Sequence, residues 1–182
     1  MFKKFDVDSD ITSQIQVKQS VQKAIRSNLR DQYPLLTPYI DDILPKKEPV
    51  NLIKGKDHVE IVACRKEPLF FRKRDSTYLP TLKLLHKFPF LLPKFQVDAG
   101  AIKFILSGAN VMAPGLNSRG GRMDEVDKDT IVGIYAEGKQ HSMGIGQTLA
   151  STKEIQTVNK GIAIELIHYL NDGLWQLEDV RY

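Results

Sequence analysis

The chain has 182 residues, of which 42% are hydrophobic and 26% are charged, a composition typical of a globular protein that buries a core. The formal net charge is +4, far from that of a polycationic tail, and a single cysteine excludes an internal disulfide framework or a multi-cysteine zinc site. No signal-like apolar run follows the first residues, and the longest uncharged stretch, residues 104–118, is too short and interrupted to span a bilayer. We therefore expect a cytoplasmic protein that does not bind membranes.

Charge and turn residues divide the chain near residue 92. Residues 1–92 carry 17 Lys and Arg against 11 Asp and Glu, a net charge of +6, whereas residues 93–182 carry 9 against 11, a net charge of −2. Eleven of the 12 glycines follow this border, and seven of the nine prolines precede it. These contrasts predict two domains, 1–92 and 93–182. Residues 88–93 between them are apolar and hold two prolines, which predicts a packed hinge with the domains in contact.

The first part is predicted to be an α+β domain. Apolar residues recur at helical spacing from Val17 to Leu29, which predicts an amphipathic helix over residues 14–31. Its polar side chains spaced four apart are expected on one solvent face: Lys18, Gln22, Arg26 and Arg30. Thr37 is placed to cap a short helix over residues 37–44. The further predicted elements are strands over 50–53, 59–63 and 69–71 and a helix over 81–87.

The second part is predicted to be rich in β-structure. Asp98 can cap a helix over residues 99–107 that Gly108 ends. The Pro114-Gly115 dipeptide predicts a turn, and a capping box from Ser151 to Glu154 opens a helix that ends at Gly161. The remaining predicted elements are a loop over 117–129 and strands over 110–112, 130–136, 143–149 and 162–170.

No pattern indicates catalysis. Nothing local marks Cys64 as a nucleophile, so we expect an ordinary core or surface thiol. No two of the four histidines lie three or four residues apart, and surface or boundary positions are expected for them. The acidic run over residues 124–129 lacks the glycine and terminal glutamate of an EF-hand, which favours a solvated loop. We therefore expect no enzymatic activity, no metal and no cofactor.

The most informative run is residues 97–116, which combines a capped helix, a Gly-Ala turn, a short strand and a Pro-Gly turn. Gly108 and Ala109 have almost no side chain, so a partner backbone could approach there and the two amides could meet a phosphate or a base edge. The alternative is that Gly108 only ends the helix and Ala109 packs. On the residues alone, the alternative is favoured.

This run resembles the core of the PUA domain, a small mixed-sheet barrel that binds structured RNA, often near a tRNA acceptor end. The residues that match the domain's pattern are Leu106, Gly108, Ala109, Val111, Met112, Pro114, Gly115 and Leu116. The segments that resemble the malignant T-cell-amplified sequence family are residues 1–5, 43–47, 69–72, 80–87, 158–161 and 168–175. The resemblance covers the whole chain and implies an N-terminal α+β domain packed on a C-terminal PUA-type mixed β-barrel.

The resemblance implies an RNA-binding translation factor with no small-molecule substrate. Such a factor acts with density-regulated protein on the small ribosomal subunit, in noncanonical initiation, reinitiation, and post-termination recycling of tRNA and subunits. A PUA-type accessory subunit for tRNA or rRNA modification, or for ribosome biogenesis, is the alternative.

Because the second part is weakly acidic, its RNA contacts must be local. The resemblance to the PUA domain implies the acceptor end of tRNA as the ligand. The candidate RNA-binding residues are Lys103, Gly108, Ala109, Met112, Pro114, Gly115, Arg119, Arg122, Lys139 and Lys160. Arg119 and Arg122 lie in a loop that departs from the family's pattern, so a phosphate contact and a solvated loop both stay open. For the first part, a basic surface that docks on the ribosome or a protein partner and an ordinary solvated face are the two interpretations. The candidate docking residues are Lys3, Lys4, Lys18, Arg26, Arg30, Lys46 and Lys47.

Overall fold

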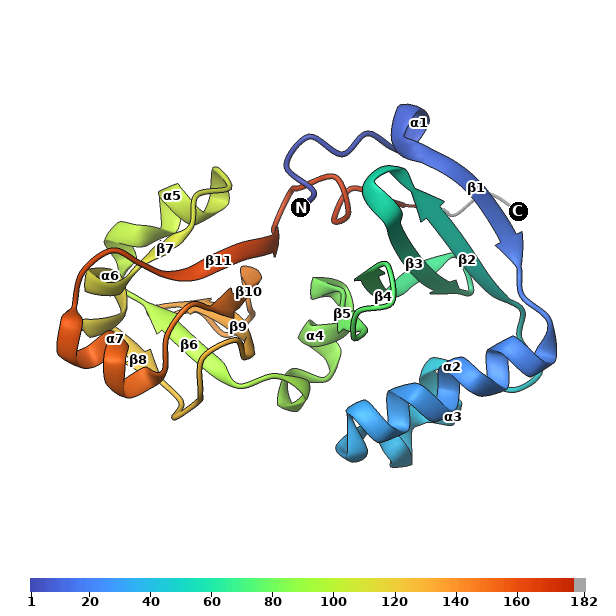
Figure 1. Ribbon diagram of the computed structural model, residues 1–182, viewed down its shortest axis with the longest axis horizontal. Helices are drawn as coiled ribbons and strands as arrows, with labels where there is room; N and C mark the ends of the chain where they lie inside the picture. The colour runs from blue at the N-terminus through green and yellow to red at the C-terminus, as the bar shows by residue number, and fades with distance from the viewer. Residues whose placement is uncertain (179–182) are drawn as a thin grey trace.

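The computed structural model describes residues 1–178 and contains two sheets, one on each side of residue 92 (Figure 1). The first sheet is antiparallel throughout, in the order β1-β2-β3-β4-β5. The second has the order β7-β11-β10-β9-β6-β8 and is mixed, because β6 runs parallel to β9. The predicted α+β fold with a mixed sheet in its second part is confirmed.

The strands of the first domain follow one another in sequence. They are β1 (Ile11–Gln16), β2 (Val50–Gly55), β3 (Val59–Cys64), β4 (Glu67–Lys73) and β5 (Leu79–Pro80). The helices are α1 (Val7–Asp10), α2 (Gln19–Gln32), α3 (Ile40–Ile43) and α4 (Leu82–Lys87), with 3₁₀ turns over Pro34–Tyr39, Lys56–His58 and Pro89–Leu91. The strands predicted around residues 50, 60 and 70 are confirmed, and so is the helix that Thr81 caps through its hydroxyl oxygen.

Both faces of the first sheet are buried. Alternate side chains of a strand point to opposite faces, so Val62 packs with α2 and α3 while its neighbour Ile61 packs on the other side. Phe2 covers that other side together with Leu174 and Leu177, which follow β11. The C-terminal segment therefore crosses back from the second domain to the first, as the red end of the ribbon shows in Figure 1.

Two helix predictions in the first domain are wrong in their bounds. Residues 11–16 form β1, and Val17 still donates its amide to the Val50 carbonyl oxygen (2.9 Å), so α2 begins only at Gln19. Pairing with β2 outweighs the local helical periodicity there. The segment predicted as a helix over residues 37–44 is a 3₁₀ turn followed by the short α3, and Thr37 caps neither. Pro38 lies inside this segment and removes an amide donor that a continuous helix needs.

The inner face of α2 carries a buried cation. Arg26 is only 4% exposed, and its guanidinium donates to the carbonyl oxygens of Ile40 and Leu44 and to the Asp41 carboxylate. The bond from Arg26 lowers the pKa of Asp41. The predicted stripe of solvated side chains on α2 is therefore wrong at Arg26. Lys18 does lie in solvent just before the helix.

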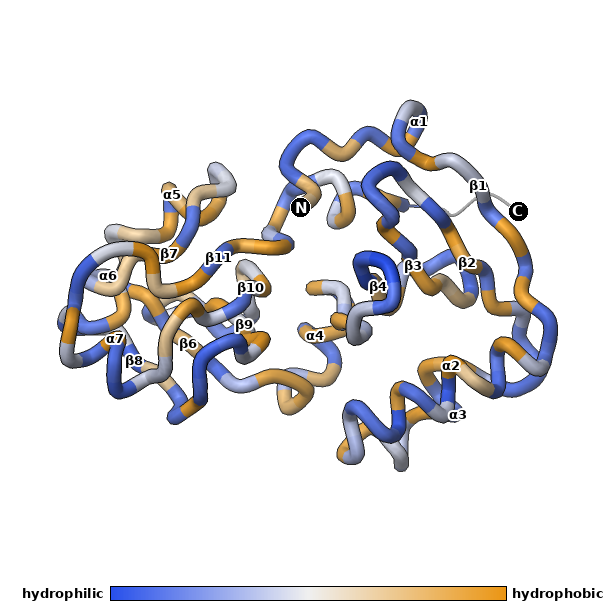
Figure 2. The backbone as a smooth tube through the Cα atoms, viewed as in Figure 1, coloured by the Kyte–Doolittle hydropathy of each residue, from blue (hydrophilic) through white to orange (hydrophobic). Residues whose placement is uncertain are grey.

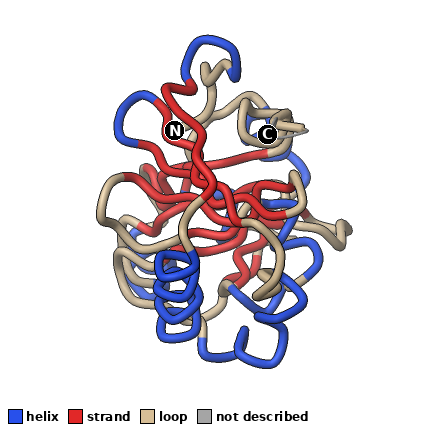
Figure 3. Tube along the Cα trace, turned by 90° about the vertical axis from the view of Figure 1, so that its right-hand side faces the viewer, coloured by secondary structure: helices blue, strands red, loops and turns tan. Residues whose placement is uncertain are grey.

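Gln22 is buried for the same reason. Its side-chain amide donates to the carbonyl oxygens of Pro45 (3.0 Å) and Glu48 (3.2 Å). The chain that packs under α2 contains little regular structure, so several buried carbonyls need donors from elsewhere. Polar side chains of α2 supply them, and hydrophilic residues therefore lie on its buried face as well as its exposed one. Figure 2 shows hydrophilic residues along α2, and Figure 3 shows helices below the strands.

The second domain wraps a mixed sheet with short helices. Its strands are β6 (Lys94–Val97), β7 (Val111–Met112), β8 (Arg122–Met123), β9 (Ile131–Ala136), β10 (Gly144–Thr148) and β11 (Ile162–Tyr169). Its helices are α5 (Ile102–Leu106), α6 (Ala113–Asn117) and α7 (Thr152–Val158), with a 3₁₀ turn over Ala99–Ala101. The Asp98 cap and the Ser151–Glu154 capping box are confirmed.

Three predictions in this domain need correction. Pro114 and Gly115 lie inside α6 and do not form an isolated turn, since proline is compatible with the first turn of a helix. The predicted loop after residue 117 contains the short β8, which pairs with β6. The helix α7 ends at Val158, with Asn159 in a left-handed conformation, before Gly161 is reached.

The two domains meet around a buried histidine at the end of β11. His168 is 1% exposed, its Nε2 accepts the amide of Leu82 at the start of α4 (3.1 Å), and its Nδ1 lies 2.7 Å from the Asp172 carboxylate. Because Nε2 accepts, the ring proton resides on Nδ1 and is donated to Asp172. The surface or boundary position predicted for the histidines is wrong here. A period-two pattern of buried residues along β11 places His168 inward, next to the first domain.

Aromatic and apolar contacts complete this joint. The rings of Phe2 and Phe71 meet the His168 ring edge-on, with centroids 5.9 and 5.7 Å away. Leu91 and Leu92 of the predicted hinge are buried in one cluster with Ile145 of the second domain. The hinge is thus packed and the domains are in contact, as the apolar junction predicted.

A second histidine, His86 of α4, also links the domains. Its Nε2 lies 2.6 Å from the Ser142 carbonyl oxygen, and its ring packs on His141 and Trp175. Burial lowers the pKa of His86, although its bond to the Ser142 carbonyl acts in the opposite direction.

Replacing Arg26 tests the role of the buried guanidinium. Arg26→Met leaves the carbonyls of Ile40 and Leu44 without this donor, so we expect unfolding to need about 2–3 kcal/mol less free energy. Lys23→Met, an exposed position on the same helix, should change stability by less than about 0.5 kcal/mol. Urea titrations of both variants measure the difference. Equal stabilities would show that Arg26 is not needed under α2.

Acid should weaken the fold through His86. The unfolded chain protonates this histidine near pH 6.5, whereas the folded chain does so only at lower pH. The stability that the neutral His86 ring contributes is therefore complete above about pH 6.5. It declines as the pH falls towards the pKa of His86 in the folded chain. Urea titrations between pH 7.5 and 5 should show a smaller loss of unfolding free energy for His86→Gln than for the unmodified chain. His58→Gln, which removes an exposed imidazole, is the control, and identical losses in all three proteins would contradict this role.

Candidate nucleic-acid interface

An exposed apolar surface lies at the edge of the second sheet, where β7 is the edge strand beside β11. We call it the β7 face, and its exposed apolar side chains are Phe104, Leu106, Met112, Val158 and Ile162. Met112 lies opposite Ile162 in the β7–β11 pairing, so the two side chains are neighbours. They are 49% and 46% exposed, which is unusual for large apolar residues in a sheet. A cluster of this kind is typical of a binding surface.

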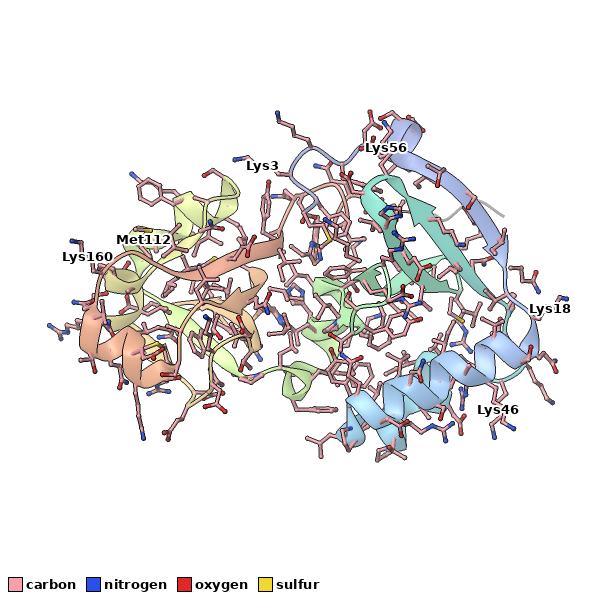
Figure 4. The ribbon with its side chains drawn as sticks, viewed as in Figure 1. Lys3, Lys18, Lys46, Lys56, Met112 and Lys160 are labelled. Carbon is pink, nitrogen blue, oxygen red and sulfur yellow. The ribbon has the colours of Figure 1, made fainter. Side chains whose placement is uncertain are left out.

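Lysines border the β7 face. The Lys103 ammonium lies 5.0 Å from the centroid of the Phe104 ring, and Lys160 is exposed between Val158 and Ile162. Figure 4 shows Lys160 and Met112 close together at the same end of the domain. Apolar side chains on which bases can stack, next to cations that can meet phosphates, are what binding of single-stranded nucleic acid requires.

The Gly108-Ala109 turn lies beside this face but offers no free amides. The Gly108 amide donates to Ile105 (2.9 Å) and the Ala109 amide donates to Phe104 (3.0 Å), bonds that end helix α5. The expectation that these amides meet a phosphate is therefore wrong. Gly108 has a φ of +88°, and a Cβ atom there would lie 2.8 Å from the Tyr169 hydroxyl oxygen. The turn shapes the surface, and contact of RNA with Gly108 or Ala109 stays a prediction.

Pro114 and Gly115 hold the β7 edge in place. The Gly115 carbonyl accepts the amide of Asp98 (3.0 Å), and Ala113 donates its amide to the Gly161 carbonyl (2.9 Å). Pro114 itself is exposed beside Met112. The matched run therefore positions the edge strand and the helix that follows it.

The predicted residues Arg122 and Lys139 come from other parts of the second sheet than the β7 face. Arg122 is on β8, at the opposite end of the strand order, and Lys139 is in the turn between β9 and β10. Arg119 lies in the segment between α6 and β8, and the Glu137 carboxylate lies against its neighbour Gly120. This arrangement favours the solvated-loop interpretation of that segment.

The candidate docking residues of the first domain fall into two groups (Figure 4). Arg30, Lys46 and Lys47 line a cavity of about 880 Å³ between α2 and the segment after α3. Arg26 forms part of the same cavity wall, but its guanidinium is already bonded and buried. Lys18 lies near this group, whereas Lys3 and Lys4 are at the N-terminal end of the chain, close to the domain joint.

Metal-ligating side chains are not gathered in the described chain. Among residues 1–178, no three His, Cys, Asp or Glu side chains are placed to hold a metal ion. The Asp124 carboxylate of the acidic run accepts the amide of Lys94 (2.8 Å). Burial raises the pKa of the Cys64 thiol, which keeps it protonated and poorly nucleophilic. Within the same residues, no helix has the length and apolar character of a membrane span.

Family models match almost the entire chain. The Pre-PUA-like domain matches residues 5–89 and the PUA domain matches residues 93–170. The second match contains the β7 face, and the two matches meet at the packed hinge. The PUA-type character predicted for the mixed sheet is confirmed.

Known proteins resemble the chain over its full length. The human protein Malignant T-cell-amplified sequence 2 is 52% identical over 181 residues, which is 100% of both chains. Translation machinery-associated protein 20 of Saccharomyces cerevisiae is 47% identical over 178 residues, covering 96% of this chain and 97% of its own. A hypothetical protein of Pyrococcus horikoshii, known from its crystal structure, has a TM-score of 0.69 at 25% identity and covers 91% of this chain and 99% of its own.

Substitution of Gly108 tests the packing of the turn. Gly108→Ala places a methyl group against the Tyr169 hydroxyl in a left-handed backbone conformation, and we expect a loss of about 2–3 kcal/mol in unfolding free energy. Gly138→Ala is the matched control, because its φ is +73° but nothing lies within 4 Å of the added atom. It should cost only about 1 kcal/mol. Equal losses in urea titrations would show that the surroundings of Gly108 are open.

Proposed function

The chain belongs to the malignant T-cell-amplified sequence family, and from this premise we propose that it is an RNA-binding translation factor. In this proposal it acts in the cytoplasm with density-regulated protein on the small ribosomal subunit. Its roles are noncanonical initiation, reinitiation, and recycling of tRNA and subunits after termination. The name of the yeast relative, Translation machinery-associated protein 20, supports a role in translation.

The observation that carries the RNA-binding part is the β7 face with its bordering lysines. The acceptor end of a tRNA is single-stranded, so its bases are free to stack on exposed apolar side chains such as Phe104 and Met112. Its phosphates can then meet the ammonium groups of Lys103 and Lys160. Both kinds of contact are local, which suits a domain whose net charge is not positive.

The basic cavity of the first domain supports a docking role. Its exposed cations, Lys46 and Lys47 with Arg30 beside them, provide the salt-sensitive attraction by which proteins hold rRNA phosphates. Arg26 belongs to the scaffold of this cavity, because its side chain is already bonded within the domain. The first domain would in this way meet the ribosome or a protein partner while the second meets tRNA.

The alternative is an accessory subunit for RNA modification or ribosome biogenesis. Both functions use an RNA-binding PUA domain, so the β7 face does not separate them. Sucrose-gradient sedimentation of cell lysates does. Migration with small ribosomal subunits, together with recovery of density-regulated protein in a pull-down and loss of reinitiation on deletion, supports the translation factor. Migration with nucleolar pre-ribosomes or a modifying enzyme would contradict it.

One substitution on the β7 face and one in the turn beside it should weaken RNA binding without unfolding the domain. Met112→Asp and Ala109→Glu each place a negative charge on the surface, and we expect at least about a tenfold loss of affinity for a tRNA acceptor minihelix with a single-stranded 3′ end. Fluorescence anisotropy measures the affinity and circular dichroism the folding. Leu35→Asp, at an exposed apolar position of the first domain, is the control. Wild-type affinity in both folded variants would show that RNA binds elsewhere.

A further inference from the structure

The first five residues form an arm that reaches the second domain. Phe2 is completely buried, its ring meets those of Phe71 and His168, and its carbonyl accepts the amide of Gly173 (3.0 Å). These contacts fix the arm at the domain joint, and Figure 1 shows the N-terminus there, between the two halves of the molecule. The position of the next residue, Lys3, is therefore set by a buried neighbour.

Lys3 lies against the turn that borders the β7 face. A Cβ atom built on Gly108 would lie 3.0 Å from Cδ of Lys3, so the lysine stem packs over the bare backbone of this glycine. Figure 4 shows Lys3 directed from the arm towards α5, the helix that carries Lys103 and Phe104. A lysine whose stem is held this way keeps its ammonium in water.

The Lys3 ammonium is available for a ligand. Among residues 1–178, no carboxylate forms an ion pair with it, and it is exposed. The carboxylates of Asp172 and Glu165 interact with the amino group of Met1, whose pKa is lowered mainly by burial despite them. Lys4 differs, because it lines a pocket of the first domain together with Asp10 and Lys56, away from the turn.

We propose that Lys3 belongs to the RNA site of the second domain and binds a backbone phosphate of the RNA that occupies the β7 face. The inference rests on the proposed function of that face and adds to it a residue from the other domain. A site shared in this way requires the two domains to keep their relative positions, which the joint around His168 provides. It also adds a cation from the basic first domain to a domain of negative net charge.

A charge-removing substitution that keeps the stem tests this proposal in the full-length chain. Lys3→Met should lower the affinity for the acceptor minihelix about three- to tenfold. The slope of log affinity against log salt concentration should decrease by about 0.7–0.9, the value of one phosphate contact. Lys3→Arg should restore both quantities, because it restores the charge. Lys4→Met is the matched control and should bind as the unmodified chain does.

The outcomes separate this inference from the proposed function. If Met112→Asp weakens binding while Lys3→Met leaves affinity and salt slope unchanged, the β7 face binds RNA and the role of Lys3 is overturned. Equal effects of Lys3→Met and Lys4→Met would also overturn it, since they would reflect general charge and no defined contact. If neither Met112→Asp nor Lys3→Met changes binding, the RNA site is elsewhere and both proposals fail. Thermal unfolding of Lys3→Met confirms that the joint is intact.

Discussion

The hydrogen bond between the Leu82 amide and the His168 ring is the contact on which the arrangement of the two domains depends. It joins the first residue of α4 to β11 of the second sheet, and Asp172 fixes the ring by accepting its Nδ1 proton. Asp172 also accepts the amides of Tyr169 and Trp175, so the chain turns there and returns to the first domain. A buried polar cluster with every bond satisfied allows one relative placement of the domains, because any shift leaves a donor or acceptor unpaired.

Function follows from this fixed placement. The joint holds the N-terminal arm, and the arm places Lys3 over Gly108 at the border of the β7 face. Within the second domain, lysines border the apolar β7 face, although this domain carries a negative net charge. The excess of positive charge lies in the first domain, and part of it lines a separate cavity. In the proposed function, the β7 face is the local contact surface for RNA and the basic cavity is the docking surface, and the joint around His168 connects the two domains.

The sequence was informative wherever structure is determined locally. Caps at Asp98 and Ser151, most strands, and the packed hinge follow from short patterns, and the run over residues 97–116 indicated the PUA domain. The sequence was not informative where a residue is buried by contacts with partners far away in the chain. The spacing of Gln22 and Arg26 is typical of a solvated helical face. Both are nevertheless buried, because they donate hydrogen bonds to backbone carbonyl oxygens of the chain beneath α2. His168 and the arm were missed for the same reason, since their partners lie far away in sequence. The spacing of His168 and Asp172, four residues apart, was the one available signal.

The most direct test is to map bound RNA on the protein by amide chemical shifts. A uniformly ¹⁵N-labelled chain would be titrated with an acceptor minihelix that ends in a single-stranded 3′ segment. The account predicts the largest shift changes in α5, β7 and residues 158–162, and a change at Lys3 that exceeds the change at Lys4. Changes confined to β8 and the β9–β10 turn, or to the cavity beside α2, would contradict the assignment of RNA binding to the β7 face.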